Sequence, residues 1–153
     1  MLTDKDNKER VVAIIDTGVD YTHEDLQDVM WKNPYESRQL GGKYGYNWAE
    51  NNGDPMDDNG HGTHVAGIIK ATANNGIGVS GAVNSSNIKI MALKFLDDTG
   101  MGDTFAAVEA YNYIYKAQLL GTNVVAVNDS WGGEEDVEEG DDALKSVIDM
   151  VGE

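Results

Sequence analysis

The side chains with the clearest chemical potential are one carboxylate and one imidazole, each at the edge of an expected element. Asp16 directly follows the apolar residues 11–15, and His61 stands between Gly60 and Gly62, which leave its ring accessible at an expected helix start. A buried carboxylate bonded to one ring nitrogen fixes the imidazole tautomer, so the other nitrogen is free to act as general base. The pair predicts acid–base chemistry; a turn aspartate before Gly18 and a structural histidine are the alternatives.

The elements that must position this pair alternate between strand and helix. Strands are expected at residues 11–15, 44–48, 88–96 and 123–127, and helices at 62–72, 104–120 and 142–151, with residues 20–58 otherwise irregular. Asp103 or Thr104 is expected to cap the second helix, and Gly121 to end it. Residues at helical spacing predict the buried faces of the three helices: Val65, Ile68, Ile69; Val108, Tyr111, Tyr115, Leu119; Leu144, Val147, Ile148, Val151.

This alternation is typical of a parallel sheet with right-handed crossovers. We therefore predict an α/β fold of three layers, in which a mostly parallel sheet carries helices on both faces. Residues 1–153 form one domain without repeats or a linker. Asp16 falls at the carboxyl end of its strand, where open α/β sheets place active-site groups.

Composition narrows the classes of partner. The chain has 153 residues, a net charge of −16 and no cysteine. The charge argues against nucleic acid and anionic membrane surfaces but suits divalent cations. No apolar run approaches the roughly 18 residues of a membrane span, so membrane insertion is not expected. Met1 leads straight into polar residues, so we expect any export signal to have been removed or never included.

Three segments resemble the subtilisin family of serine proteases. Residues 15–26 are similar to the family's Asp motif, residues 61–67 (His-Gly-Thr-His-Val-Ala-Gly) to its His motif, and residues 128–133 to the segment that lines its substrate cleft. The resemblance implies a subtilisin-like fold and a serine endopeptidase in which Asp16 orients His61, the general base. It makes His23 structural, with Glu24 departing from a common proline, and we expect His64 to pack on another face of the helix.

The resemblance also implies how substrate is held. The family adds an extended peptide as a strand between two backbone segments, here Gly100-Met101-Gly102 and Ser130-Trp131-Gly132. Trp131 would border the pocket for the residue before the scissile bond. Plain turns are the alternative for both segments.

Calcium is the cofactor that the resemblance implies. Its tight site would use the side chains of Asp25 and Asn75 and the carbonyls of Ala73, Ile77 and Val79. The family's N-terminal ligand has no clear match here. Two groups of acidic residues each have two interpretations. Asp54, Asp57 and Asp58 form either a second ion site or a solvated turn. Residues 134–142, which include Glu134, Glu135 and Asp136, form either a solvated loop or a surface that favours basic substrate residues.

The family's nucleophilic serine and oxyanion asparagine have no match in the sequence. We therefore read residues 1–153 as the N-terminal portion of a catalytic domain, inactive by itself. The sheet looks unfinished, so one flank of residues 123–127 and the apolar face of the last helix should lie exposed. They should pair with the missing C-terminal half or with another copy of the chain. Family habit places the protein in the secreted or cell-surface class.

Two other functions stay open. Residues 14–19 fit the hydrophobic-Asp-Thr-Gly motif of a retroviral-type aspartic protease, in which two Asp16 carboxylates would share a proton. That fold is all-β, which the expected helices contradict. The other alternative is a non-catalytic calcium-binding or interaction module on a degenerate protease scaffold, although such a module has no chemical need for Asp16 and His61.

Overall fold

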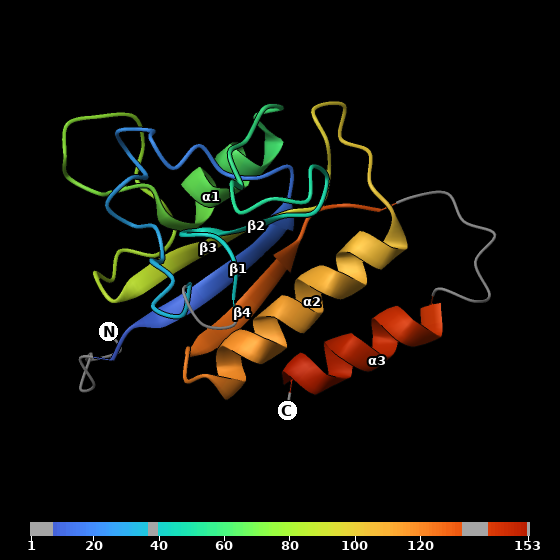
Figure 1. Cartoon of the computed structure of the whole chain (residues 1–153). Helices are drawn as coiled ribbons and strands as arrows, with labels where there is room; N and C mark the ends of the chain where they lie inside the picture. The colour runs from blue at the N-terminus through green and yellow to red at the C-terminus, as the bar shows by residue number, and fades with distance from the viewer. Residues whose placement is uncertain (1–7, 37–39, 133–140, 153) are drawn as a thin grey trace.

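Four parallel strands form one sheet in the order β2-β3-β1-β4 (Figure 1). The structure is a computed structural model that describes residues 8–36, 40–132 and 141–152. The strands are β1 (Arg10–Asp16), β2 (Gly45–Asn47), β3 (Ile88–Lys94) and β4 (Val124–Asp129). The helices are α1 (His61–Lys70), α2 (Thr104–Leu119) and α3 (Asp141–Gly152). Every predicted element is present within a few residues of its expected bounds.

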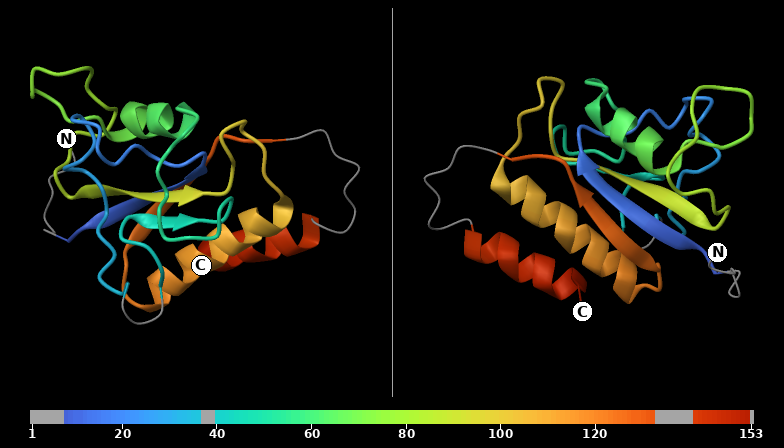
Figure 2. Two further views of the ribbon diagram at one scale, coloured as in Figure 1. Left: turned by 45° about the horizontal axis from the view of Figure 1, so that its top comes forward. Right: turned by 180° about the vertical axis from the view of Figure 1, so that it is seen from behind.

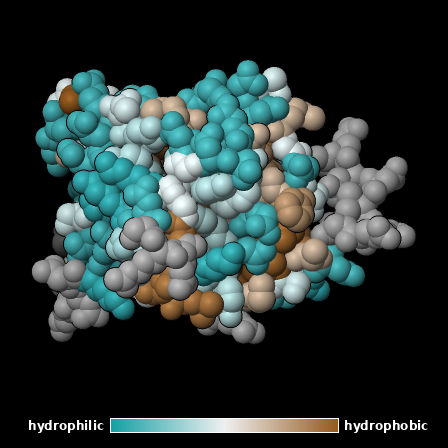
Figure 3. Space-filling view, in the orientation of Figure 1, coloured by the Kyte–Doolittle hydropathy of each residue, from teal (hydrophilic) through white to brown (hydrophobic). Residues whose placement is uncertain are grey.

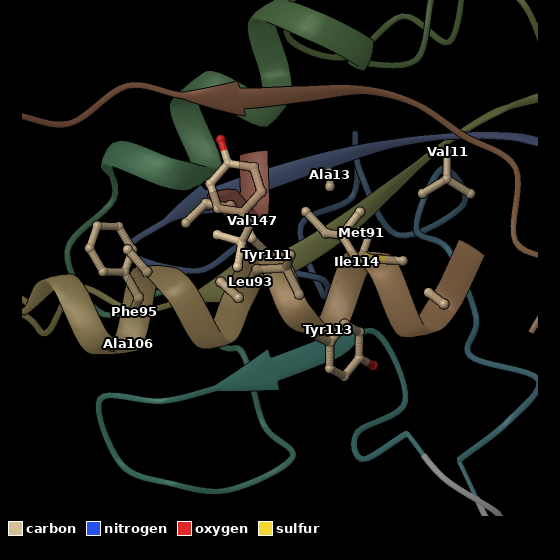
Figure 4. Packing of buried hydrophobic residues seen from close by; sticks show 14 of the residues in the cluster. Val11, Ala13, Met91, Leu93, Phe95, Ala106, Tyr111, Tyr113, Ile114 and Val147 are labelled. Carbon is tan, nitrogen blue, oxygen red and sulfur yellow. The ribbon is translucent and has the colours of Figure 1, made fainter. Parts of the chain in front are cut away.

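The helices lie on both faces of the sheet, as predicted. α1 covers one face, and α2 covers the other with α3 alongside it (Figures 1 and 2). β1 is apolar from Val11 to Ile15 because its alternate side chains enter two cores. Val12 and Ile14 pack on the α1 side, while Val11, Ala13 and Ile15 join the α2 side, where Tyr111, Ile114 and Val147 also pack (Figure 4). Asp16 is thereby fixed at the end of a strand that is buried on both faces.

The predicted buried faces of the helices are partly wrong. Ile68 is 56% exposed and Leu119 is 69% exposed, and His64, which we expected to pack, also lies at the surface. The buried residues of these helices include many small ones: Gly62 and Ala66 beside Lys70 in α1, and Ala106, Ala107, Ala110 and Ala117 beside Tyr111, Tyr113 and Ile114 in α2. Small residues let a helix approach the sheet closely, so the contact face follows the alanines rather than the largest apolar side chains.

β4 is an edge strand, and its free flank is exposed as predicted: Val125 is 50% exposed. α3 buries Val147 against α2 but leaves Ile148 42% exposed. A groove of about 470 Å³ is lined by β4, α2 and α3, including Val125, Ile148 and Val151. In the view of Figure 3, polar surface covers the upper part of the molecule and apolar surface gathers in the lower part, around α2.

No helix among residues 8–36, 40–132 and 141–152 combines the length and apolarity needed to cross a bilayer.

Candidate active site

Asp16 and His61 are in direct contact across 45 residues of sequence. Nδ1 of His61 lies 2.8 Å from Oδ1 and 2.9 Å from Oδ2 of Asp16. Asp16 is fully buried, and its Oδ1 also accepts a 2.7 Å hydrogen bond from the Thr17 amide. The His61 side chain is 48% exposed. A carboxylate held on Nδ1 leaves Nε2 as the ring nitrogen available to a reacting group.

The first turn of α1 is docked onto the end of β1 through backbone contacts. A Cβ at Gly62 would lie 2.1 Å from the Gly18 carbonyl oxygen and 3.2 Å from Asp16 Oδ1. Only glycine fits this close approach. The need for a glycine at position 62 therefore comes from backbone packing more than from access to the His61 ring. The Gly62 amide donates to Thr17 Oγ1 at 3.0 Å. The position of His61 relative to Asp16 is therefore set by the backbone on both sides.

All six residues predicted to hold substrate line one cleft with His61. The cleft has a volume of about 650 Å³ and includes Gly100, Met101, Gly102, Ser130, Trp131 and Gly132. Sequence reasoning missed four of its other members: Phe95 and Leu96, which follow β3, together with Thr17 and Asn59. Thr17, Phe95 and Leu96 come within two residues of the end of a strand, and Asn59 lies two residues before His61, which is the signal that could have found them.

Two links hold the cleft walls. Asn59 joins the loop before α1 to the loop after β3, because its Nδ2 donates to the Asp98 carbonyl at 2.9 Å while its Oδ1 accepts from the His61 amide at 3.2 Å. On the opposite wall, the rings of Phe95 and Trp131 meet edge to face at 4.9 Å. Trp131 therefore has a fixed aromatic neighbour where it borders the cleft.

A second carboxylate, Asp129, links the cleft wall at Trp131 to helix α2. Its carboxyl group accepts a hydrogen bond from the Tyr111 hydroxyl of α2 and one from Trp131 Nε1 at 3.3 Å. The residue lies at the exposed sheet edge, but its carboxyl is desolvated there. This desolvation raises the pKa of Asp129 even though the two hydrogen bonds act to lower it. Desolvation and the same carboxylate raise the pKa of Tyr111.

The residues predicted to bind calcium lie partly together. Asp25 is 3% exposed, its Oδ1 accepts from Asn75 Nδ2 at 2.6 Å, and a Cβ at Gly78 would lie 2.7 Å from its Oδ2. In the described part of the chain no cationic side chain pairs with this buried carboxylate. Asn75 presents its Nδ2 rather than its Oδ1 to Asp25, so its side chain would have to turn to serve as a ligand beside that carboxylate. A buried carboxylate without a cationic partner has the chemistry of a hard-cation ligand.

The acidic residues of the predicted second ion site each have a different partner in the structure. Asp54 accepts from the Tyr21 hydroxyl, Asp58 pairs with the buried Lys94 at 2.6 Å, and Asp57 accepts hydrogen bonds from the start of α1. Across the described residues, no three acidic or histidine side chains gather as a metal site. Glu134, Glu135 and Asp136 lie outside the described residues, as does Gly133 of the third motif.

The aspartic-protease alternative is wrong. Its fold is all-β, whereas this chain forms a parallel sheet covered by helices, and the carboxylate of Asp16 is paired with an imidazole.

Comparison with known proteins supports the same chemistry. The sequence profile described as "Subtilase family" matches residues 7–151. The chain is 42% identical over 102 residues to a thermophilic serine proteinase of Bacillus sp. (strain AK1), covering 67% of this chain and 22% of that protein. It is 36% identical over 135 residues to subtilisin-like protease 1 of Plasmodium falciparum (isolate 3D7), covering 81% and 19%. A cell wall-associated protease of Bacillus subtilis (strain 168) is 38% identical over 104 residues, covering 68% and 10%.

Solved structures agree on the fold. A cold-adapted subtilisin-like serine proteinase has a TM-score of 0.63 at 26% identity, covering 95% of this chain and 44% of that one. The S41 psychrophilic protease has a TM-score of 0.69 at 26% identity, covering 95% and 42%. The chain thus spans less than half of these structures and no more than about a fifth of the relatives named above.

Proposed function

The chain belongs to the subtilase family, and from that premise we propose that it supplies the carboxylate and the general base of a serine endopeptidase. The observation that carries the proposal is the pair of contacts, at 2.8 and 2.9 Å, between His61 Nδ1 and the buried carboxylate of Asp16. The family relationship alone gives a serine protease. The contact supports our proposal of these roles for the two residues.

In this mechanism Asp16 holds the proton of the imidazole on Nδ1. Nε2 of His61 accepts the proton of a serine hydroxyl as that oxygen attacks the scissile carbonyl, and Asp16 stabilises the imidazolium that forms. His61 then gives the proton to the leaving amine. We place the serine and the oxyanion donor in a part of the protease outside this sequence. Ser130 is unsuited, since it belongs to the cleft wall, where Asn128 Nδ2 donates to its Oγ at 2.7 Å, and its hydroxyl makes no hydrogen bond to His61.

We propose an extended polypeptide as the substrate. The two cleft walls, residues 100–102 and 130–132, offer backbone groups to a strand laid between them, and this mode binds through the main chain regardless of sequence. The ring pair of Phe95 and Trp131 would receive an apolar part of the residue before the scissile bond.

We also propose calcium as a structural cofactor. Asp25 would be its carboxylate ligand, with the carbonyls of Ala73, Ile77 and Val79 and a turned Asn75 side chain completing the shell. Support comes from the buried charge of Asp25, which the ion would offset. Bound in this way, the ion would tie the loop after α1 to the segment after β1.

The remaining half of the catalytic domain is the partner we propose for the β4 edge. A chain that leaves β4 through α3 by a right-handed crossover returns beside β4, where the flank of Val125 is open. The solved relatives, of which this chain covers 42–44%, have the length to supply that strand. We place the whole protease outside the cell or at its surface, in keeping with the family and with the name of the Bacillus subtilis relative.

The proposal is tested on the complete protease that contains this chain. It should cleave peptide bonds and be inactivated by a serine-directed reagent, and His61→Ala should abolish both reactions while circular dichroism stays unchanged. Exchanging the exposed His64 for Ala is the matched control and should leave the rate intact. A complete protease that is inert to the reagent, or unaffected by His61→Ala, would show that the assignment is wrong and would favour a non-catalytic module.

A further inference from the structure

Asp57 accepts more hydrogen bonds than any other side chain in the described part of the active site. Its Oδ1 accepts from Thr17 Oγ1 at 2.9 Å and from the amides of Asn59 and Gly60 at 3.0 and 2.9 Å. Its Oδ2 accepts from both the amide and the hydroxyl of Thr63, at 2.9 and 2.6 Å. These five bonds come from three separate places in the chain.

The bonds join the end of β1 to the start of α1. Thr17 directly follows Asp16, while Gly60 and Thr63 lie on either side of His61. Thr63 Oγ1 also accepts from the Asp20 amide at 2.9 Å, which adds a second link to the segment after β1. One carboxylate therefore bonds the neighbours of both members of the Asp16–His61 pair and makes no hydrogen bond to either member.

Three side chains cap the start of α1: Asn59 Oδ1 accepts from the His61 amide, Thr17 Oγ1 from the Gly62 amide and Asp57 Oδ2 from the Thr63 amide, and only Asp57 among them carries a charge. The N-cap residue itself is Gly60, with φ of 104°, which has no side chain to contribute. Asp57 provides the negative charge that a helix N-terminus favours. Burial acts to raise the pKa of the Asp57 carboxyl, but the hydrogen bonds from Gly60, Thr63 and Asn59 outweigh burial and hold the pKa below its ordinary value. Asp57 is thus charged throughout the pH range in which a histidine base works.

We propose that Asp57 is a positioning residue that sets the alignment of His61 on Asp16, and hence the catalytic rate. The inference rests on the proposed function, because the rate it governs is that of the serine endopeptidase. A loss of this alignment weakens proton transfer at Nε2, whereas Asp57 makes no hydrogen bond to residues 100–102 or 130–132 of the cleft walls. The expected signature is a change in kcat rather than in KM.

The test uses the complete protease and four variants. Active sites are counted with a serine-directed reagent, and kcat and KM are measured per titrated site. Asp57→Asn should lower kcat by about 10- to 100-fold, with KM changed by no more than about twofold. Thr63→Val, which removes one hydroxyl bond to Asp57, should lower kcat severalfold, and Thr63→Ser should restore it. Asp54→Asn, on the same loop and bonded to Tyr21, should change nothing.

Three results would overturn the inference. The first is an unchanged kcat per titrated site in Asp57→Asn, with loss only of titratable sites, since that describes a purely structural residue. The second result applies if Asp57→Asn does not fold: equal kcat values for Thr63→Val and Thr63→Ser would also overturn the inference. The third result comes from the ¹⁵N spectrum of His61, which does not depend on activity. If that spectrum is identical in Asp57→Asn and the unmodified protein, Asp57 does not position His61. An unmodified protease without activity would overturn the proposed function, and the spectrum would still test the role of Asp57.

Discussion

The region between β1 and α1 and the region between β4 and α3 differ in how far this chain completes them. Around Asp16 the backbone is packed so closely that a Cβ added at Gly62 would collide with it. The polar groups of Thr17, Asp57 and Thr63 are hydrogen-bonded there. Around β4 a groove stays open, and both Val125 and Ile148 are exposed. Figure 2 shows the same contrast: α1 lies directly on the sheet, whereas α3 lies along the outside of α2.

The contrast indicates where catalytic precision comes from. The contact between Asp16 and His61 is made inside this chain. The second cleft wall, residues 130–132, extends from the open edge strand, so the partner that we propose for β4 should help to set its final position. Changes near α1 should therefore act on chemistry, and changes near β4 on assembly.

The largest effect is expected from Asp16→Asn in the complete protease. The amide no longer holds the correct imidazole tautomer, so kcat should fall by about 10⁴-fold while the fold is kept. Steady-state kinetics together with circular dichroism measure it. Asp28→Asn, at an exposed carboxylate, is the matched control. A fall of less than tenfold would mean that the contact seen here does not serve catalysis.

Calcium removal should act on stability rather than on the acid–base pair. If the ion is present at about 100 times its dissociation constant, chelation should remove about 2.7 kcal/mol of unfolding free energy. Denaturant unfolding with and without chelator measures the loss. In Asp25→Asn the chelator should have almost no effect. Equal sensitivity of this variant and the unmodified protein would contradict a calcium site at Asp25.

Gly62→Ala tests the tight packing beneath His61. Its Cβ would meet the Gly18 carbonyl oxygen at 2.1 Å, so the first turn of α1 must shift, at a cost of about 1–3 kcal/mol. Chemical denaturation gives the stability. Gly67→Ala, in the same helix with nothing within 4 Å of the added atom, should be neutral or stabilising. Similar losses for the two variants would show that the approach of α1 to β1 is looser than described.

Val125→Lys tests the open region. In the chain by itself the change should alter unfolding free energy by no more than about 0.5 kcal/mol, since the side chain is already half exposed. In the complete protease the same lysine should be covered and should destabilise by several times as much. Unfolding of both proteins measures the difference. An equal effect in the two would show that nothing packs on this flank.

The smallest effect is a pH dependence of opposite sign in the two regions. The pKa of Asp57 is lowered by folding, so its contribution to stability is present above its ordinary value of 3.8 and is lost as pH falls through the folded-state value. The pKa of Asp129 is raised, so its contribution is complete below 3.8 and is lost as pH rises through the folded-state value. Unfolding of Asp57→Asn and Asp129→Asn against pH should show these opposite trends; parallel trends would contradict the assignment.

The sequence predicted the elements and the pair at their ends because those signals are local. A continuous apolar run ending in Asp16 and a glycine-flanked His61 are each readable within a few residues. The faces of α1 and α2 were harder to predict. Ile68 and Leu119 fit a helical stripe, yet small residues decide which side approaches the sheet, and that choice depends on partners far away in sequence.

The supporting contacts of the site were not predictable in the same way. Asp57 is an acidic loop residue by sequence, and its bond to Thr17 spans 40 positions. Tyr111 reads as a core residue of α2, and its hydroxyl contact with Asp129 follows only from the placement of β4 beside that helix. Such contacts follow from the three-dimensional arrangement, because the sequence does not show which groups will donate hydrogen bonds to a given carboxylate.

The central claim is the contact between Asp16 and the Nδ1 atom of His61, and ¹⁵N NMR of histidine-labelled protein tests it most directly. The chain has three histidines, so His61→Gln assigns the signals. The account predicts that Nδ1 of His61 carries a proton shared with a carboxylate, shown by a strongly downfield proton resonance that disappears in Asp16→Asn while the rest of the spectrum is kept. A His61 signal that is identical in Asp16→Asn and the unmodified protein would contradict it.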